Sequence, residues 1–158
     1  MLAGMLLCLA CSSNGTPGAE PVGWITGREA LQKMMQNAKQ WSPDAEAIRL
    51  YSGICKNARL EGLCDDWRAV VVSASRRKSA GFYWSRAGIR HNEVADYDGQ
   101  SSGQYPIDVA KLRADSDTAF RVTKEHGGKP LLDKNPQIEI RYAMEFEKRI
   151  GQLIWLVF

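Results

Sequence analysis

The cysteines have the most distinctive chemistry in this chain. Cys55 and Cys64 flank one short connection between two runs of strand-forming composition. Two cysteines at the bases of one connection can form a disulfide when their Cα atoms come within about 7 Å. Free thiols and a zinc site are the alternatives, but zinc needs four ligands, and the other candidates, His91 and His126, lie far apart in the sequence. We therefore predict the disulfide, which would stabilise the fold by roughly 2–3 kcal/mol in the loop-entropy picture.

The histidines and carboxylates do not form a catalytic pattern. His91 and His126 lack a cysteine, serine or acidic partner at a recognisable spacing. The sequence has no Gly-rich phosphate loop, no Gly-x-Ser-x-Gly elbow and no His-Glu-x-x-His motif. Asp65 and Asp66 are adjacent, so in a strand they would face opposite ways, which fits loop capping better than shared acid–base work. We expect no catalytic, cofactor or metal site.

Four aromatic residues could form a binding surface, although such residues are ordinary in strands: Tyr51, Tyr83, Trp84 and Tyr97.

The N-terminal region has the composition of an export signal. Residues 1–10 are almost wholly apolar, a run too short for a bilayer span of roughly 20 residues but typical of a secretory signal peptide. The end of this run, Leu-Ala-Cys with Cys11 last, resembles the lipobox of bacterial lipoproteins. The resemblance implies that Cys11 is lipidated, begins the mature chain and anchors it to a membrane. Residues 11–23 would then be a flexible tether. An uncleaved apolar N-terminus is the alternative.

Export also implies a compartment and excludes some partners. An oxidising compartment preserves a disulfide. By the same lipoprotein resemblance, Ser12 is compatible with attachment to the outer membrane, facing the periplasm, in a bacterium with two membranes. The formal charge of +3 is too small, and the basic residues too scattered, for a nucleic-acid-binding face. The one basic run, residues 76–78, is expected to be a solvated turn.

The first half of the chain predicts a helix followed by an antiparallel sheet. Thr26 and Glu29 have the spacing of a capping box, and Ser42-Pro43 ends the helical pattern. From Ala47 the period changes to two, and short turns join the following strand-like runs. The predicted core of the helix is Leu31, Met34, Met35, Ala38 and Trp41, and that of the first strand is Ile48, Leu50, Ser52 and Ile54. The later strands are predicted at residues 67–75, 82–85 and 89–94.

The second half repeats this pattern in shorter form. Residues 96–106 are polar and rich in Gly and Ser, which indicates a boundary. Residues 115–117 offer capping side chains to a helix that should halt at Gly127-Gly128, followed by a short turn that ends at Asn135-Pro136. An alternating strand is predicted from Ile138 to Phe146, then a turn at residues 148–151 and a last strand from Leu153. The predicted helical apolar residues are Ala119, Phe120 and Val122.

Both halves resemble the PepSY-like group of secreted and lipid-anchored bacterial proteins. The resembling segments are Ala30-Leu31, residues 41–45, Trp67-Arg68-Ala69-Val70, residues 117–120 with Gly127-Gly128, and residues 155–158. The resemblance implies an α+β fold of two tandem cystatin-like modules, each with a helix and an antiparallel sheet. The modules are expected at residues 24–95 and 115–158, with a linker at 96–114. The expected structural anchors are Trp41, Trp67 and Trp155.

The resemblance also implies an envelope role without catalysis. The expectation is a lipid-anchored protein that binds a protein or cell-wall partner, and the alternative is an envelope peptidase inhibitor or regulator that uses a cystatin-like edge or loop. The last strand is wholly apolar, and a strand left unpaired at a sheet edge is an aggregation template. We therefore expect either a further hairpin arm beyond Phe158 or an edge closed by another chain.

Overall fold

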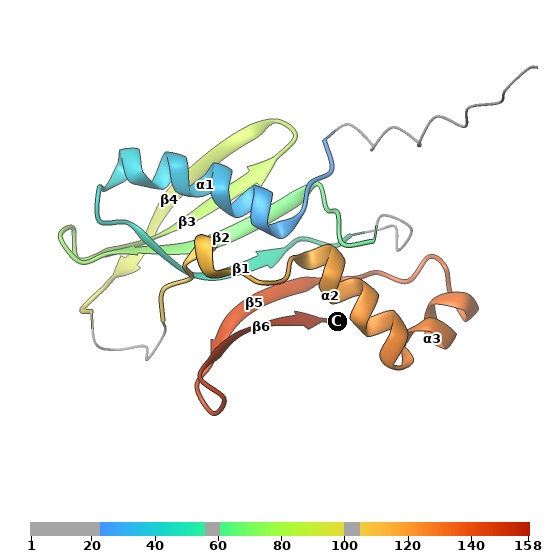
Figure 1. Cartoon of the computed structure of the whole chain (residues 1–158). Helices are drawn as coiled ribbons and strands as arrows, with labels where there is room; N and C mark the ends of the chain where they lie inside the picture. Colours follow the sequence, from blue (N-terminus) through green and yellow to red (C-terminus); the bar gives the residue numbers. More distant parts are fainter. Residues whose placement is uncertain (1–22, 56–60, 100–104) are drawn as a thin grey trace, which may run out of the picture.

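Six antiparallel strands form one sheet (Figure 1). The computed structural model describes residues 23–55, 61–99 and 105–158. The strands are β1 (Glu46–Ser52), β2 (Asp66–Ser73), β3 (Lys78–Ser85), β4 (Gly88–Asp96), β5 (Tyr142–Glu147) and β6 (Gln152–Val157). The helical segments are α1 (Gly27–Trp41), η2 (Val109–Lys111), α2 (Ser116–Thr123), η3 (Lys124–Gly128) and α3 (Lys129–Lys134). The strand order is β4-β3-β2-β1-β5-β6, which confirms the predicted α+β class with an antiparallel sheet.

The helix α1 begins and ends as the sequence predicts. The Thr26 hydroxyl accepts a hydrogen bond from the Glu29 N–H at 3.3 Å, so Thr26 is the N-cap. Ser42 is the C-cap, directly before Pro43. Of the predicted apolar face, Leu31, Met34 and Ala38 are buried, while Met35 and Trp41 are half-buried at its margin.

The strands of the first half lie close to their predicted positions, with two corrections: β3 begins at Lys78 rather than at residue 82, and one apolar residue is more exposed than predicted. A register shift between Ala47 and Arg49 is a β-bulge, so Ala47 and Ile48 are both buried. Ile54 was predicted to share the buried face, but it is 36% exposed. The reason is that β1 ends at Ser52, so the alternation that the prediction extended does not reach residue 54.

The second half differs more from its prediction. The predicted interruption at Gly127-Gly128 is confirmed, because His126 and Gly127 have non-helical backbone angles; the segment after it is the short helix α3 rather than a turn. Val122 is 43% exposed, and β5 starts at Tyr142 rather than at residue 138. Before Tyr142, Ile140 makes an isolated bridge with Cys55, and Arg141 exchanges backbone hydrogen bonds with Phe158. The periodicity of residues 138–141 is therefore that of an extended segment beside the sheet, and not of a full strand.

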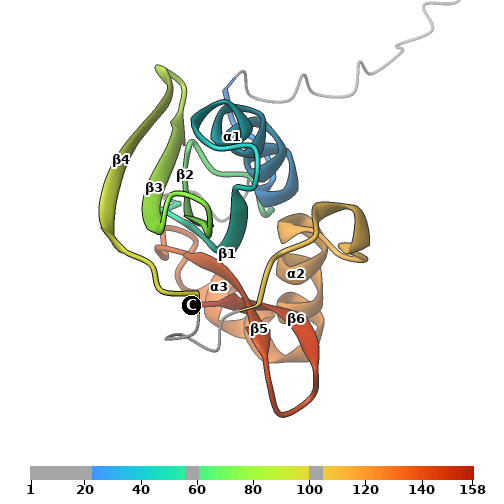
Figure 2. The same ribbon diagram turned by 90° about the vertical axis from the view of Figure 1, so that its left-hand side faces the viewer.

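Both halves of the chain contribute to one hydrophobic core. α1 packs on β1, β2 and β3, and α2 packs on β6, on the same side of the sheet (Figure 2). Trp67 of β2 is fully buried and meets Trp155 of β6 edge to face, with ring centroids 6.2 Å apart. Trp41 meets Phe82 in a similar way at 6.0 Å. Trp67 and Trp155 therefore lie on the helix-covered face of the sheet, and Trp41 packs onto that face from α1.

The N-terminal ends of α1 and α2 meet beside the two tryptophans. The Gly27 N–H donates to the Ser116 hydroxyl at 2.9 Å, and the Arg28 N–H donates to the Asp115 carboxylate at 2.9 Å. Asp115 is also the N-cap of α2. One carboxylate therefore serves the positive ends of both helix dipoles, which makes the contact between the halves specific.

The predicted disulfide is confirmed. Cys55 and Cys64 are bonded, with their Cα atoms 5.4 Å apart. The bridge closes the connection between β1 and β2, and isolated β-bridges hold Cys64 to Ile25 and Cys55 to Ile140. The predicted signal peptide, Cys11 and nearly all of the tether lie outside the described residues, as do residues 56–60 of the disulfide loop.

Candidate binding site

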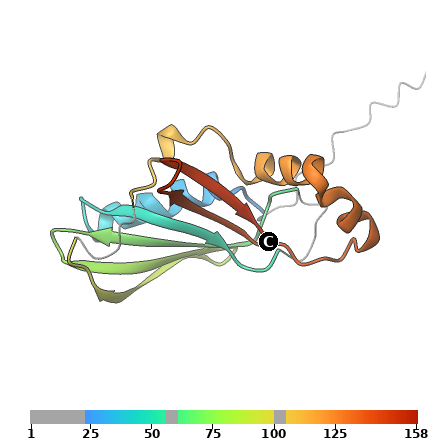
Figure 3. The same cartoon turned by 90° about the horizontal axis from the view of Figure 1, so that it is seen from below.

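One face of the sheet carries no helix of the described residues, and we call it the open face (Figure 3). Strand alternation decides which side chains lie there. Tyr51 lies between buried Leu50 and Ser52 in β1, and Tyr83 lies between buried Phe82 and Trp84 in β3. Tyr51 and Tyr83 are half-buried and point to the open face.

A row of directly opposed residues crosses four strands of this face. Arg90 on β4 is opposite Tyr83 on β3, and Tyr83 is opposite Arg68 on β2. Arg68 is in turn opposite Tyr51 on β1. We call these four residues the Arg/Tyr row. Cross-strand neighbours stand about 5 Å apart, so cationic and aromatic side chains alternate along the row.

Both guanidinium groups lie against the ring of Tyr83. The Arg68 Cζ is 5.8 Å and the Arg90 Cζ 5.4 Å from the ring centroid, within the range of cation–π attraction. Gly81 makes this arrangement possible. A Cβ atom at position 81 would lie 2.7 Å from the Tyr83 hydroxyl oxygen, so the ring lies along the strand over the space that glycine leaves.

The charges of the row are only partly neutralised. Arg68 lies 3.3 Å from a carboxylate oxygen of Asp66, whereas Arg90 is exposed and in no salt bridge with any described residue. Beside the row, a hollow of about 450 Å³ has Tyr51, Arg68 and Arg141 in its wall, together with the carboxylates of Asp65 and Asp66. Arg141 is also exposed and forms no salt bridge within the described parts of the chain. The surface therefore offers flat aromatic groups and available guanidinium groups to a ligand.

This chemistry suits binding rather than catalysis. Guanidinium groups remain protonated and can hold carboxylates through paired hydrogen bonds, but they do not act as acids or bases near neutral pH. Desolvation by burial raises the pKa of the Tyr142 phenol, so this hydroxyl also stays protonated. The open face has the side chains of a recognition surface.

A second polar cluster, which we call the serine cluster, joins the end of α1 to the β2–β3 turn. Ser42 and Ser73 each lie 2.6 Å from the Asp44 Oδ1 atom, and the Ser75 N–H donates to the other oxygen at 2.7 Å. These hydrogen bonds, with Ser42 first and Ser73 second, hold the pKa of the Asp44 carboxyl well below its usual range. A carboxylate so stabilised is a poor general base, so the serine cluster is a structural clamp.

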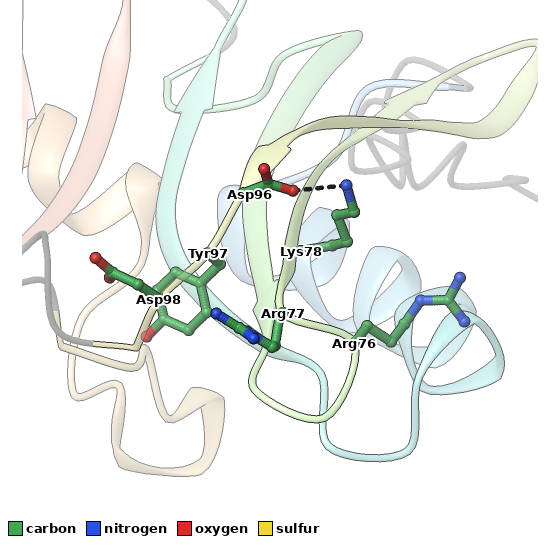
Figure 4. A pocket seen from close by; sticks show the side chains of 6 residues that line it. All are labelled: Arg76, Arg77, Lys78, Asp96, Tyr97 and Asp98. Carbon is green, nitrogen blue, oxygen red and sulfur yellow. Dashed lines mark hydrogen bonds and ion pairs between the residues drawn. The ribbon is translucent and has the colours of Figure 1, made fainter.

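A third candidate is a hollow at the tip of the β2–β3 hairpin (Figure 4). Its volume is about 420 Å³. Lys78 lies 2.7 Å from Asp96, which lowers the pKa of that carboxyl, and Arg76 lies 3.1 Å from Glu93. The charges of Arg76 and Lys78 are thus largely neutralised by nearby carboxylates. Arg76 and Arg77 lie in the predicted turn, whereas Lys78 begins β3. Residues that line this hollow are Arg76, Arg77, Lys78, Asp96, Tyr97 and Asp98.

The histidines and the carboxylate pair lie apart from one another. His91 stacks on Phe82 with ring centroids 4.9 Å apart, and His126 is exposed at the kink in η3. Asp65 is 3.6 Å from Arg86, and Asp66 pairs with Arg68, so each carboxylate has its own arginine.

Of the four aromatic residues suggested by the sequence, the structure brings two together. Tyr51 and Tyr83 belong to the open face, Trp84 is buried and Tyr97 lines the hairpin hollow. The sequence reasoning missed Arg68 and Arg90. Strand alternation could have placed Arg68 and Arg90 on the same side of the sheet as the tyrosines. Only the strand register shows that each arginine lies directly opposite a tyrosine of the next strand.

Three further findings bear on function. The described residues contain no cluster of three or more metal-ligating side chains. None of the described helices is both long enough and apolar enough to cross a membrane. The chain matches no protein-family model, no curated protein and no solved structure.

Proposed function

We propose that this chain is a non-catalytic binding protein of the bacterial cell envelope, which holds a protein partner through the open face. The observation that carries the proposal is the Arg/Tyr row. The row places two half-buried tyrosines and two arginines, one of them exposed, on a sheet face that no described helix covers, and these residue types are common in protein-binding surfaces.

The side chains of the row favour a protein as the partner. Arginine and tyrosine are enriched at the energetic centres of protein interfaces. Arg90 and Arg141 lack carboxylates among the described residues, so the complementary surface should supply them. We therefore infer a partner whose contact surface carries Asp or Glu side chains next to apolar or planar groups.

The proposal includes a lipid anchor and two PepSY-like modules. Support for the anchor is the lipobox-like sequence that ends at Cys11. Support for the modules comes from the order of the elements. In each half a helical segment precedes two paired strands, β1 and β2 after α1, and β5 and β6 after α2 and α3. The two strand pairs extend in opposite directions from the place where β1 meets β5. An anchor would keep the open face within reach of envelope proteins.

The test is a comparison of variants at position 83. Tyr83→Ala removes the ring that both guanidinium groups contact, whereas Tyr83→Phe keeps the ring and serves as the matched control. The full chain is captured from membranes of the native host after mild cross-linking, and the partner is quantified by mass spectrometry. We expect Tyr83→Ala to reduce partner recovery by about tenfold or more, while Tyr83→Phe stays within about threefold of the parent chain.

Several results would count against this proposal. Equal recovery of the same protein with a folded Tyr83→Ala variant would exclude the open face as the contact. Recovery of glycan or peptide fragments alone, dependent on Tyr83, would replace the protein partner by the cell wall. A recovered peptidase that loses activity at stoichiometric amounts of the chain would support the inhibitor alternative.

A further inference from the structure

The disulfide between Cys55 and Cys64 joins parts of the chain that lie far apart in the sequence. Cys64 exchanges backbone hydrogen bonds with Ile25, at 3.0 and 3.1 Å, shortly before α1 begins. Cys55 exchanges backbone hydrogen bonds with Ile140, at 2.9 and 3.3 Å, shortly before β5 begins. The bridge therefore lies where the first half of the chain meets the segment that leads into β5.

The described end of the disulfide loop also packs on α2. The Ser116 hydroxyl, at the start of α2, donates to the Gly62 carbonyl at 2.7 Å and accepts from the Gly27 N–H of α1 at 2.9 Å. Lys124 lies 2.8 Å from Glu61, so an ion pair joins the loop to the helical segment after α2. The loop is thus held against the second half of the chain at two points.

Gly62 brings the backbone of the loop into contact with the backbone of α2. Its φ is +96°, in the left-handed region that favours glycine, and a Cβ atom at this position would collide with the backbone of Asp117. A helix backbone cannot move aside as a flexible side chain can. The position of residue 62 is therefore matched closely to the start of α2.

The disulfide fixes this loop before α2 docks. Both cysteines lie in the connection between β1 and β2, so the bond stays intact when the second half separates from the first. Without the bond, the loop gains conformational freedom whenever it leaves α2, and ordering each of its residues again costs about 1–2 kcal/mol. Docking of α2 on a reduced loop then has to offset this cost.

The strand pairing between the two halves is short. β1 and β5 are paired at Leu50 with Met144 and at Tyr51 with Ala143. By contrast, β2 and β3 are paired along their whole lengths, and β3 and β4 are paired from end to end with one bulge. The attachment of β5 and β6 to the sheet therefore depends more on the contacts around the disulfide than β2, β3 and β4 do.

We propose that the disulfide is a redox-sensitive clasp, whose reduction releases α2 and the β5–β6 pair from the first half of the chain. A dithiol reductant supplies two electrons and two protons, so that its own sulfurs become joined while Cys55 and Cys64 become thiols. Cys55 is 3% exposed and Cys64 is 1% exposed, so the reductant reaches them only after the surrounding structure opens. Opening and reduction therefore favour each other.

The first test is hydrogen–deuterium exchange of the full chain, oxidised and reduced with dithiothreitol. Cys8 and Cys11 are replaced by alanine, so that the two bridged cysteines are the only ones in the chain. We expect reduction to speed exchange in α2, β5 and β6 by about tenfold or more, and in β3 by less than about threefold. Equal acceleration in both halves, as in global unfolding of the reduced chain, would overturn the proposal, and so would unchanged exchange in α2.

The second test measures how fast dithiothreitol reduces the bond in variants that start oxidised. Gly62→Ala pushes the loop off α2, and Gly88→Ala is the matched control, because Gly88 also has a positive φ, +117°, but a Cβ atom there meets nothing within 4 Å. If Gly62→Ala does not fold, as judged by circular dichroism, Ser116→Ala replaces it, because that change removes the hydroxyl that holds the Gly62 carbonyl.

The loop variant should be reduced about tenfold faster than the parent chain, and Gly88→Ala should stay within about threefold of the parent. Equal rates for the loop variant and Gly88→Ala would overturn the proposal, since the bond would then open independently of the contact between the loop and α2.

Discussion

At the scale of single residues, the described polar groups gather in clamps and in the Arg/Tyr row of the open face. Asp44 illustrates the first use. Its carboxylate accepts hydrogen bonds from the hydroxyls of Ser42, Ser73 and Ser75, two of which belong to fully or nearly fully buried residues. Buried hydroxyls need partners, and one charged acceptor satisfies all three.

The serine cluster predicts a pH-dependent stability. The pKa of Asp44 is lower in the folded chain than in the unfolded chain, so its contribution is complete above the unfolded value of about 4 and is lost as pH falls toward the folded value. Asp44→Asn should therefore be less stable than the parent chain at pH 7, and the difference should narrow below about pH 4. Urea unfolding at the two pH values measures it, and a difference that is constant with pH would refute the assignment.

At the scale of elements, the junction of α1 and α2 determines how the two halves fit. A Cβ atom at Gly27 would lie 2.4 Å from a ring carbon of Trp155 and 3.0 Å from one of Trp67. Neither ring can easily retreat, because the Trp67 Nε1–H donates to the Ile25 carbonyl at 3.0 Å and the Trp155 Nε1–H to the Ala114 carbonyl at 3.2 Å.

Gly27→Ala should accordingly destabilise the protein, despite the higher helix propensity of alanine. Overpacking of this kind costs about 1–3 kcal/mol. Lys33→Ala, on the exposed face of the same helix, is the control and should change stability by less than about 0.5 kcal/mol. Chemical denaturation of the three proteins provides the comparison. Equal stability of Gly27→Ala and the parent chain would show that the junction is loosely packed.

The disulfide fastens β1 to β2 at the same end of the molecule as this junction. The loop that it closes has about ten residues, so replacement of both cysteines by alanine should lower stability by roughly 2–3 kcal/mol. Reduction of the parent chain should have a similar effect, and alkylation followed by intact-mass measurement should show Cys55 and Cys64 protected until a reductant is added. Ready alkylation of both thiols in exported protein would contradict the structure.

Local patterns predicted these elements well where one face of a strand or helix is buried. Thr26, Ser42 and the alternation around Trp67 fixed α1 and β2 because capping and burial act over a few residues. The burial of Ile54 and the first residue of β5 were predicted wrongly because periodicity alone does not show where pairing begins and stops, whereas the predicted burial of Ile140 and Met144 on one face is confirmed. The Arg/Tyr row could not be predicted for a related reason, since it depends on the register of four strands that are distant in sequence.

At the scale of the whole molecule, the sheet has one covered face and one open face. The proposed anchor lies before the first described residues, and a tether there would leave the open face free to meet partners.

The anchor is testable separately from the fold. Expressed with a complete export signal, Cys11→Ala should lose membrane attachment because it lacks the thiol that would carry the lipid. The membranes are washed with high salt, which removes proteins held by charge alone. Retention of this variant in washed membranes would refute lipidation at Cys11.

The most direct test of the open face as a binding surface is site-specific photo-cross-linking in living cells. A photoreactive phenylalanine analogue replaces Tyr83 in one strain and Gln36, on the exposed side of α1, in another. The analogue retains an aromatic ring at position 83, so the contact with the flanking arginines is kept. We predict a discrete protein adduct from position 83 and none from position 36. An adduct from position 36 alone, with both variants folded and exported, would contradict a partner on the open face.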